Sequence, residues 1–405
     1  MPMGYGWVLG DIIFSWVGTS NDKGSVCQDR TKNLRNLSSM GGHGRAQRSD
    51  LPIVYSITLG CVCLSILASV SMKCAKLMLT AAVLTLLGTS CLAVIVPLSS
   101  SFRVGFYNQT CPAAESIVRS TLISRFQSDI RLPARLIRLL FHECFVTAEK
   151  DAAPNLNVAG YDAVDAAKSA LENACPGVVS CADIEVLLAR EAVSLLGGPN
   201  ITVPTGRLDA RSSSASLAAS TLPGLGTSVP GMIAAFAAKG FTTQDMVALL
   251  GAHTVGAAFC NSFSYRLYNF KGTNQSDPSM NSILLGKLRT VCPRSPVNPD
   301  PTVALDQGNN SINAFDSSFF RELLNGNGIL EIDQAIAVHN QTAAIVAAYA
   351  ANSTSGNSTA GNITVVPSLN FGSNFAQVFV KLSMLDVLTG GNSSATIRKN
   401  CAIIS

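Results

Sequence analysis

Arg138 and His142 are residues whose types and spacing suggest chemistry. They interrupt a largely apolar run from Leu136 to Phe145, and their i, i+4 spacing puts them on one face of a helix. A buried arginine needs a partner or an anionic ligand, and a neutral imidazole beside it is a general base. Such a pair could remove a proton from a small acidic molecule and stabilise the negative charge left behind. The alternative is a core histidine beside a structural ion pair.

A second histidine, His253, follows an apolar segment that Thr242 and Asp245 could cap at its N-terminus. The residues around His253 are Gly251, Ala252 and Gly256, and small neighbours allow a large flat group to come close. Two histidines on two buried helices, with no Cys/His cluster nearby, argue against zinc. They fit opposite faces of a cofactor such as haem, one as the axial ligand and one as the catalytic base.

The elements that must position these residues are predicted to be almost entirely helical. Apolar periodicity between Ser101 and Ser405 predicts a mainly α fold with one short strand over 201–204. No βαβ alternation, glycine-rich phosphate loop or repeat is present. The helices are expected at 112–131, 133–146, 160–173, 181–196, 229–239, 243–256, 259–269, 279–291, 315–325, 341–351 and 373–387.

Composition excludes several classes of protein. Only 13% of the 405 residues are charged, so a coiled coil and a disordered polyampholyte are excluded. The net charge of +4 is spread along the chain without a basic run, which argues against nucleic-acid binding. Twelve cysteines indicate an oxidising compartment.

The N-terminal hundred residues resemble a leader rather than a folded domain. Two lysines, an apolar run and the sequence Cys91-Leu92-Ala93 predict a signal peptide over 72–93. Residues 1–71 would then be an upstream extension, disordered or spurious, and 94–405 the mature protein. Because the apolar stretches 51–70 and 77–98 approach the length of a spanning helix, a membrane anchor is the alternative. Secretion agrees with nine N-x-S/T glycosylation motifs after Leu98, headed by Asn108, Asn200, Asn274, Asn309, Asn340, Asn352, Asn357, Asn362 and Asn392.

The motifs of the mature chain resemble those of one family, the class III secretory haem peroxidases of plants. The order and spacing agree from about Phe106 to Cys401, which is essentially the whole mature chain. The motifs that carry the resemblance are Phe106 to Pro112, Arg138 to Val146, Cys175 to Asp183, Gly251 to Gly256, Arg266 to Phe270 and Thr389-Gly390. The resemblance implies a plant haem-peroxidase fold, in which two helical lobes, distal and proximal, enclose haem b.

The resemblance also implies a role for individual residues. His142 would take a proton from peroxide and return it to the leaving oxygen, while Arg138 stabilises the charge. Asn155 would hydrogen-bond the histidine and keep it basic, as a third group that orients a base. The other matched positions are Phe141 (access to the iron), His253 (iron ligand), Asp333 (carboxylate behind that ligand) and Pro223 (docking of aromatic donors).

Two calcium sites belong to the family pattern, and this chain departs from one of them. The proximal ligands would be Thr254, Asp306, Ser311 and Asp316. About a dozen residues are missing after Val146, where most distal ligands should lie, and only Glu143, the Val146 carbonyl and Glu149 remain. Because calcium takes six to eight oxygen ligands, the distal site is expected to be lost or severely weakened.

Cysteine counting gives an odd number, seven, from Ser101 onward, so at least one is unpaired or bonded to another chain. Counting leaves the connectivity open. The resemblance implies the pairs Cys111–Cys175, Cys181–Cys401 and Cys260–Cys292. It leaves Cys144 as the odd thiol, because its family partner lies in the missing loop.

The resulting hypothesis is a secreted, monomeric peroxidase that reduces hydrogen peroxide and oxidises small phenolic donors. It would act outside the cell or in the cell wall, with a vacuolar or membrane-anchored form as the alternative. Because of the missing loop, a peroxidase-fold cell-wall glycoprotein without robust turnover is the competing function. A skipped exon at codons 146–149 is a further explanation of the loss.

Overall fold

A computed structural model of the chain describes residues 102–146, 155, 157–212, 221–308, 311–351, 369–390 and 395–403. The predicted signal peptide, the upstream extension, Glu149 and five of the nine glycosylation motifs lie outside these residues. No helix in the described part of the chain is long and apolar enough to cross a membrane.

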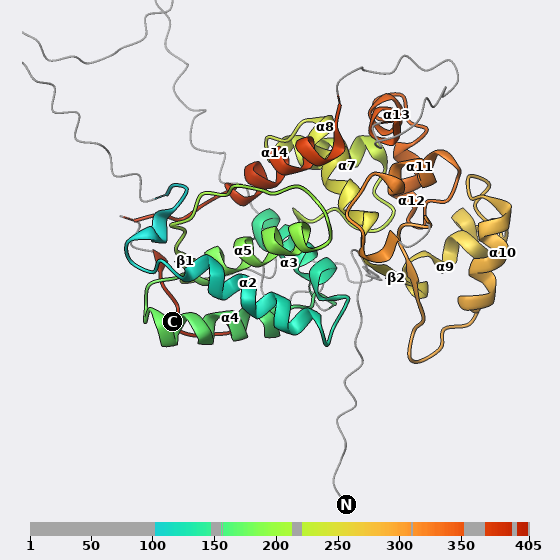
Figure 1. The fold of residues 1–405 in the computed structure, drawn as a ribbon. Helices are drawn as coiled ribbons and strands as arrows, with labels where there is room; N and C mark the ends of the chain where they lie inside the picture. Colours follow the sequence, from blue (N-terminus) through green and yellow to red (C-terminus); the bar gives the residue numbers. More distant parts are fainter. Residues whose placement is uncertain are drawn as a thin grey trace, which may run out of the picture. The chain divides into compact units, whose positions relative to one another are not determined.

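Helices make up the described part of the first lobe and lie beside one another in Figure 1. They are α2 (Ala114–Phe126), α3 (Leu132–Val146), α4 (Tyr161–Ala174) and α5 (Cys181–Leu195), preceded by the 3-10 turn η1 (Phe106–Asn108). Helix α3 packs against α5, and α2 packs against both α4 and α5. Leu136, Leu139 and Leu140 are each 2% exposed or less, so the prediction that α3 is buried is confirmed.

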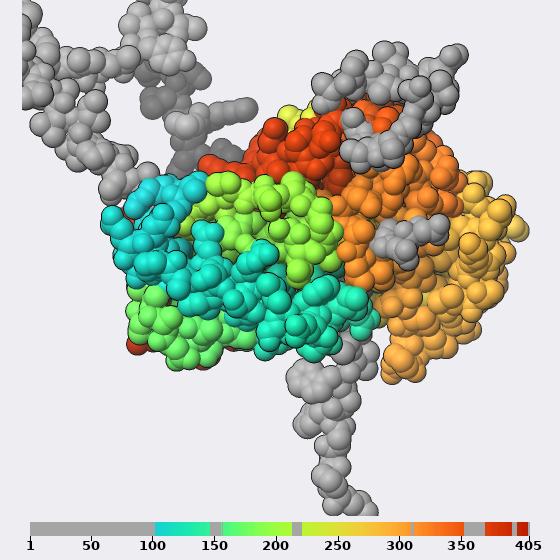
Figure 2. Space-filling view, viewed as in Figure 1, coloured from blue at the N-terminus to red at the C-terminus, as the bar shows by residue number. Residues whose placement is uncertain are grey.

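The second lobe consists of shorter helices and turns. Its helices are α7 (Val229–Ala238), α8 (Thr243–Leu250), α9 (Cys260–Tyr268), α10 (Ser282–Val291), α11 (Ser318–Leu324), α12 (Glu331–Ile336) and α13 (Ala343–Ala351). Its 3-10 turns are η3 (Gly251–Thr254), η4 (Phe270–Gly272) and η5 (Ser311–Asn313). In the space-filling view the two lobes, cyan to green and orange, meet along a continuous seam (Figure 2).

Helix α14 (Phe371–Ser383) comes after both lobes in sequence and packs on both, because it contacts α8 as well as α3. The mainly α fold with two helical lobes is therefore confirmed. The strands are short and antiparallel: β1 (Asp209–Ala210) pairs with β4 (Ala395–Thr396), and β2 (Ala257–Phe259) pairs with β3 (Thr302–Ala304).

The prediction of a strand over 201–204 is wrong. These residues form no strand, and the adjacent Thr205 makes only an isolated bridge with Arg103. Burial nevertheless alternates there, since Ile201 and Val203 are buried and Thr202 is exposed. Buried and exposed side chains alternate as they do in a strand, but among the described residues no neighbouring strand is hydrogen-bonded to this segment.

The capping box at the start of α8 is confirmed. The Thr242 side chain accepts a hydrogen bond from the backbone of Asp245, and the Asp245 carboxylate accepts one from the backbone of Thr242. The α-helix ends at Leu250, earlier than the expected 256, and tightens into η3. A Cβ at Gly251 would lie 2.4 Å from a ring carbon of Phe371, so only glycine fits at this change of helix type.

The structure contains the three disulfides Cys111–Cys175, Cys181–Cys401 and Cys260–Cys292. Cys144 forms none. The second of these joins the start of α5 to the end of the chain.

Candidate active site

Three polar residues of the first lobe lie together in the core. His142 is 2% exposed, Arg138 5% and Asn155 1%. The His142 Nδ1 atom lies 2.8 Å from Asn155 Oδ1, and Arg138 Nε lies 3.3 Å from His142 Nε2. Because Asn155 Oδ1 is an acceptor, the hydrogen bond places the neutral imidazole's proton on Nδ1. The Nε2 atom is then the basic one, and it is the atom beside Arg138.

The electrostatics of this cluster keep the imidazole neutral. Burial and the charge of Arg138 lower the pKa of His142 to about 3, and the hydrogen bond to Asn155 opposes this shift. The Arg138 guanidinium is held in place by Nη1, which donates to the carbonyl of Asn157 at 3.0 Å. The cluster therefore combines a neutral base with a fixed cation.

His253 lies in η3, 2% exposed, with its Nδ1 atom 2.9 Å from Asp333 Oδ1 and 3.0 Å from Oδ2. Asp333 is fully buried on α12. A carboxylate in this position fixes a proton on Nδ1 and leaves Nε2 as the ring nitrogen that can bind a metal. The arrangement is that of a histidine ligand with a carboxylate behind it.

A cavity between the lobes is lined by residues from both clusters. Arg138 and Phe141 of α3 face it from one lobe, and Ala252 and His253 from the other. Most of its remaining lining is apolar: Ile137, Leu140, Met232, Phe236, Leu249, Leu250, Phe375, Phe379 and Leu382. An apolar chamber with a single histidine on the second lobe suits a large flat cofactor with a central metal.

The opposite side of Arg138 faces a different, cationic pocket. Arg131 and Arg135 line it together with Arg138. Arg135 and Arg138 lie on one face of α3, and Arg131 is the residue directly before that helix. Arg135 also pairs with Asp129 at 2.5 Å. The apolar chamber and the arginine-lined pocket share Arg138, and together they supply groups that suit haem, which has an apolar body and a carboxylate edge. The sequence analysis missed Arg131 and Arg135, although their spacing from Arg138 could have revealed them.

Phe141 stacks on Phe145 and on Phe236 of α7, with ring centroids 4.9 and 6.1 Å apart. This places an aromatic wall beside His142. Pro223 is buried in the segment before α7 and does not line the cavity.

The residues expected at the proximal calcium site lie together, apart from Ser311, whose side chain is outside the described part. Thr254 Oγ1 donates to Asp306 Oδ2 at 3.3 Å, and the Asp316 backbone amide donates to Thr254 Oγ1 at 3.4 Å. Asp306 also accepts from Ser318 Oγ. Burial raises the pKa of Asp306, and the nearby Asp316 adds to the shift. A threonine hydroxyl beside a buried carboxylate supplies oxygen atoms of the kind that calcium binds.

Of the residues expected at the distal calcium site, Glu149 and the side chain of Val146 lie outside the described residues, and Glu143 is the one whose side chain can be located. Among the described residues, no group of three or more His, Cys, Asp or Glu side chains is arranged to hold a metal, either here or at the proximal position. Val146 ends α3, and Glu143 lines a separate cavity of about 310 Å³ on α3, together with Glu185. Burial and the charge of Glu143 raise the pKa of Glu185 well above its usual range. The sequence analysis did not single out Glu185.

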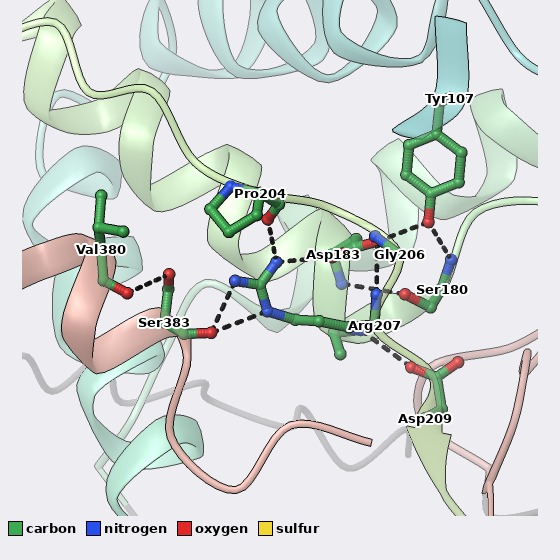
Figure 3. Close-up of polar contacts among 10 residues, drawn as sticks. Tyr107, Ser180, Asp183, Pro204, Gly206, Arg207, Asp209, Val380 and Ser383 are labelled. Atoms are coloured by element: carbon green, nitrogen blue, oxygen red, sulfur yellow. Dashed lines mark hydrogen bonds and ion pairs between the residues drawn. The ribbon is translucent and has the colours of Figure 1, made fainter. Parts of the chain in front are cut away.

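A buried network ties α14, which lines the cofactor cavity, to the first lobe (Figure 3). Arg207 Nη1 donates to Asp183 Oδ1 at 2.7 Å, and its Nε and Nη2 atoms donate to the Ser383 carbonyl at 2.9 and 2.6 Å. The Tyr107 hydroxyl donates to Asp183 Oδ2 at 2.6 Å. Because Ser383 is the last residue of α14, the network fixes the C-terminal end of that helix.

Comparison with known proteins identifies the family of the chain. A family model described as "Peroxidase" matches residues 118–352. The chain is 42% identical to Peroxidase 57 of Arabidopsis thaliana over 75% of its own length and 92% of the relative. It is 41% identical to Peroxidase N1 of Nicotiana tabacum over 77% of its own length and 93% of the relative.

The chain belongs to the peroxidase family, and its relatives place it among the class III plant peroxidases. It is a haem peroxidase that acts on hydrogen peroxide. The predictions of the family, the enzyme class and the fold are thereby confirmed.

Proposed function

We propose that Arg138, His142 and Asn155 form the peroxide-activating site of this enzyme, and that His253 holds the haem iron through Nε2. When bound, haem supplies the redox-active iron at which the peroxide bond breaks. The observation that carries the proposal is the hydrogen bond between His142 Nδ1 and Asn155 Oδ1, because it makes Nε2 the basic atom next to Arg138.

In this proposal His142 moves the proton. Its neutral Nε2 takes a proton from one peroxide oxygen and then returns it to the other, which leaves as water. The Arg138 guanidinium stabilises the negative charge that develops while the oxygen–oxygen bond breaks. Two phenolic donors each lose one electron and one proton, so that one peroxide gives two waters. A pKa of about 3 keeps His142 ready to accept its proton at mildly acidic pH.

Asp333 acts behind the iron ligand as a positioning residue. Its two oxygens at Nδ1 fix the orientation of the His253 ring and increase the electron density at Nε2. We also propose a calcium ion held by Thr254, Asp306, Asp316 and Ser311. It would brace the segment directly after His253, since Thr254 is the next residue in the chain.

We propose that the protein is secreted and acts on small phenolic donors outside the cell or in the cell wall. Three disulfides in the described residues support an oxidising compartment. The expectations of a signal peptide over 72–93, of a monomer and of donor docking at Pro223 remain proposals. Pro223 is the weakest of these, because the residue is buried outside the cavity lining.

The test is an absorption spectrum of the haem-loaded, secreted protein before and after hydrogen peroxide is added. We expect the Soret band to shift with peroxide, and His142→Leu to slow that reaction by a factor of about 10²–10⁴. His339→Leu is the matched control, because His339 does not line the cofactor cavity. A Soret band that does not respond to peroxide would favour the non-catalytic glycoprotein instead.

A further inference from the structure

The glycosylation motifs are the sequence feature that the peroxidase site does not explain. Four of the asparagines that head them belong to the described residues, and all four are exposed: Asn108, Asn200, Asn274 and Asn340. Exposure alone makes each a possible acceptor of a glycan. The surroundings of Asn200 add two further observations.

The first observation is the orientation of the Asn200 amide. Its Oδ1 accepts a hydrogen bond from Ser194 Oγ, in the last turn of α5, at 3.1 Å. Because the oxygen is directed to the helix, the Nδ2 atom is directed away from it. Ile201 is buried and Thr202 is exposed, so the asparagine and the threonine of the motif lie on the same, solvent-facing side of the segment.

The second observation is an open groove of about 700 Å³ that Asn200 itself lines. One wall is the loop from Gly197 to Asn200, which has little side chain, and the other walls come from the start of α11 and of α14. Arg321 and Asn370 supply hydrogen-bonding groups. The volume lies within the range of small-ligand sites, which combine apolar surface with a few polar groups.

Two aromatic rings, each only 4% exposed, lie under the base of this groove. Phe315 and Phe371 line it and stack on each other, with ring centroids 5.4 Å apart. Sugars have polar hydroxyl edges and apolar C–H faces. The Arg321 and Asn370 groups of the walls can bind the hydroxyls, and the small exposed part of the two rings adds apolar surface. A carbohydrate fixed at Asn200 would have this surface directly beside its point of attachment.

We propose that Asn200 carries an N-linked glycan whose first sugars lie in this groove. In the transfer, Nδ2 loses a proton and bonds to C1 of the first sugar of a lipid-linked oligosaccharide, and the lipid pyrophosphate leaves. The proposal rests on the secretion proposed above. The seated sugars connect the 197–200 loop to α11 and α14, and α14 also lines the cofactor cavity.

The first test uses the full chain secreted from plant cells, with each glycopeptide identified by mass spectrometry. We expect Asn200 to be occupied. In the native protein, an endoglycosidase should remove the Asn200 glycan about tenfold more slowly than the Asn274 glycan. This ratio is expected if the Asn200 glycan is out of the groove about a tenth of the time. After denaturation the two rates should be equal.

Two outcomes overturn the proposal. If Asn200 is vacant while Asn274 is occupied, the site is wrong although secretion is right. If every motif is vacant, the proposal fails together with secretion, and the peroxide test above still reports on the active site. Equal removal rates in the native protein would mean that the glycan does not lie in the groove.

Variants separate attachment from seating. Thr202→Ala removes the motif, and we expect the midpoint of thermal unfolding to fall by about 2 °C. Asn274→Gln is the matched control and should leave the midpoint unchanged. Arg321→Ala retains the motif but removes a polar wall, so the native removal rate at Asn200 should rise towards that at Asn274. The glycan does not lie in the groove if Arg321→Ala leaves the removal rate at Asn200 unchanged and Thr202→Ala leaves the midpoint of thermal unfolding unchanged.

Discussion

The Nδ1 atom of His253 lies 2.9 and 3.0 Å from the two carboxylate oxygens of Asp333, which is 80 residues further along the chain. Both residues are buried, so the carboxylate's charge is directed at the imidazole rather than solvated. Asp333 sits in the first turn of α12, where an acidic side chain is favoured by the helix dipole. The pair joins two segments of the second lobe at the point where the iron ligand must be fixed.

Asp333→Asn removes this charge while retaining the size of the side chain. We expect peroxidase activity to fall by a factor of about 10–100, because the hydrogen-bonding partner of a ligating histidine tunes the metal. The reduction potential of the haem iron should rise, and redox titration followed by absorption measures it. Asp333→Glu should restore part of the lower potential. A potential unchanged in Asp333→Asn would show that the residue has a structural role only.

The depressed pKa of His142 predicts the effect of acid on stability. An unfolded histidine has a pKa of about 6.5, so below that pH the unfolded chain binds a proton that the native state excludes. The free energy of unfolding should therefore be fully retained above pH 6.5. It should fall by up to about 1.4 kcal/mol per pH unit as the pH drops towards 3.

Urea unfolding at a series of pH values checks this dependence. In His142→Leu the slope between pH 3 and 6.5 should become shallower, since the excluded proton is gone.

Arg138→Leu should raise the pKa of His142 by removing the neighbouring cation, and so move the acid limb of the peroxide reaction to higher pH. An acid limb that stays in place would mean that another group limits the reaction.

Removal of calcium should destabilise the second lobe. If calcium binds at Thr254, Asp306 and Asp316, its addition at about 100 times Kd should raise the free energy of unfolding by about 2.7 kcal/mol. A chelator should reverse the gain, and Asp306→Asn should abolish it. Asp300→Asn is the control, because Asp300 pairs with the Asn261 backbone outside this cluster. A calcium response retained in Asp306→Asn would place the ion elsewhere.

The thiol of Cys144 should be unreactive in the native protein. Burial raises its pKa to about 12, although the charge of Arg207 opposes this shift. At pH 8 the thiolate fraction is then about a thousandfold smaller than that of an ordinary cysteine. Alkylation by iodoacetamide, followed by mass spectrometry, should be correspondingly slow until the protein is unfolded. Because Cys144 is half-buried and lines the 310 Å³ cavity, fast labelling of the native protein would show that the reagent enters this cavity and that the thiol ionises more readily than expected.

Local patterns in the sequence were sufficient to predict much of the site. The i, i+4 spacing of Arg138 and His142 and the capping box of Thr242 and Asp245 depend on residues close in the chain, and both are present. Asn155 and Asp333 could be assigned only through the family resemblance, because their contacts with the histidines span 13 and 80 residues. The structure brings each to its expected partner.

Other features could not be read from the sequence, for different physical reasons. The strands are two or three residues long, too short for an alternating pattern. The hydrogen bonds from Arg207 to the Ser383 carbonyl span 176 residues and use a backbone acceptor, which has no sequence signature. Glu185 is one of four charged residues of α5, and the sequence does not show that the fold brings Glu143 of α3 near it.

The cofactor cavity takes its walls from opposite ends of the mature chain. Phe141 is contributed by α3, whereas Phe375 and Phe379 are contributed by α14, and Arg207 and the Cys181–Cys401 disulfide fasten the C-terminal part to α5. During synthesis the N-terminal lobe emerges from the ribosome first, so it must wait for the last helix before the chamber can close. We therefore expect a chain truncated before α14 to lack the wall that Phe375 and Phe379 supply, and to hold its cofactor less firmly.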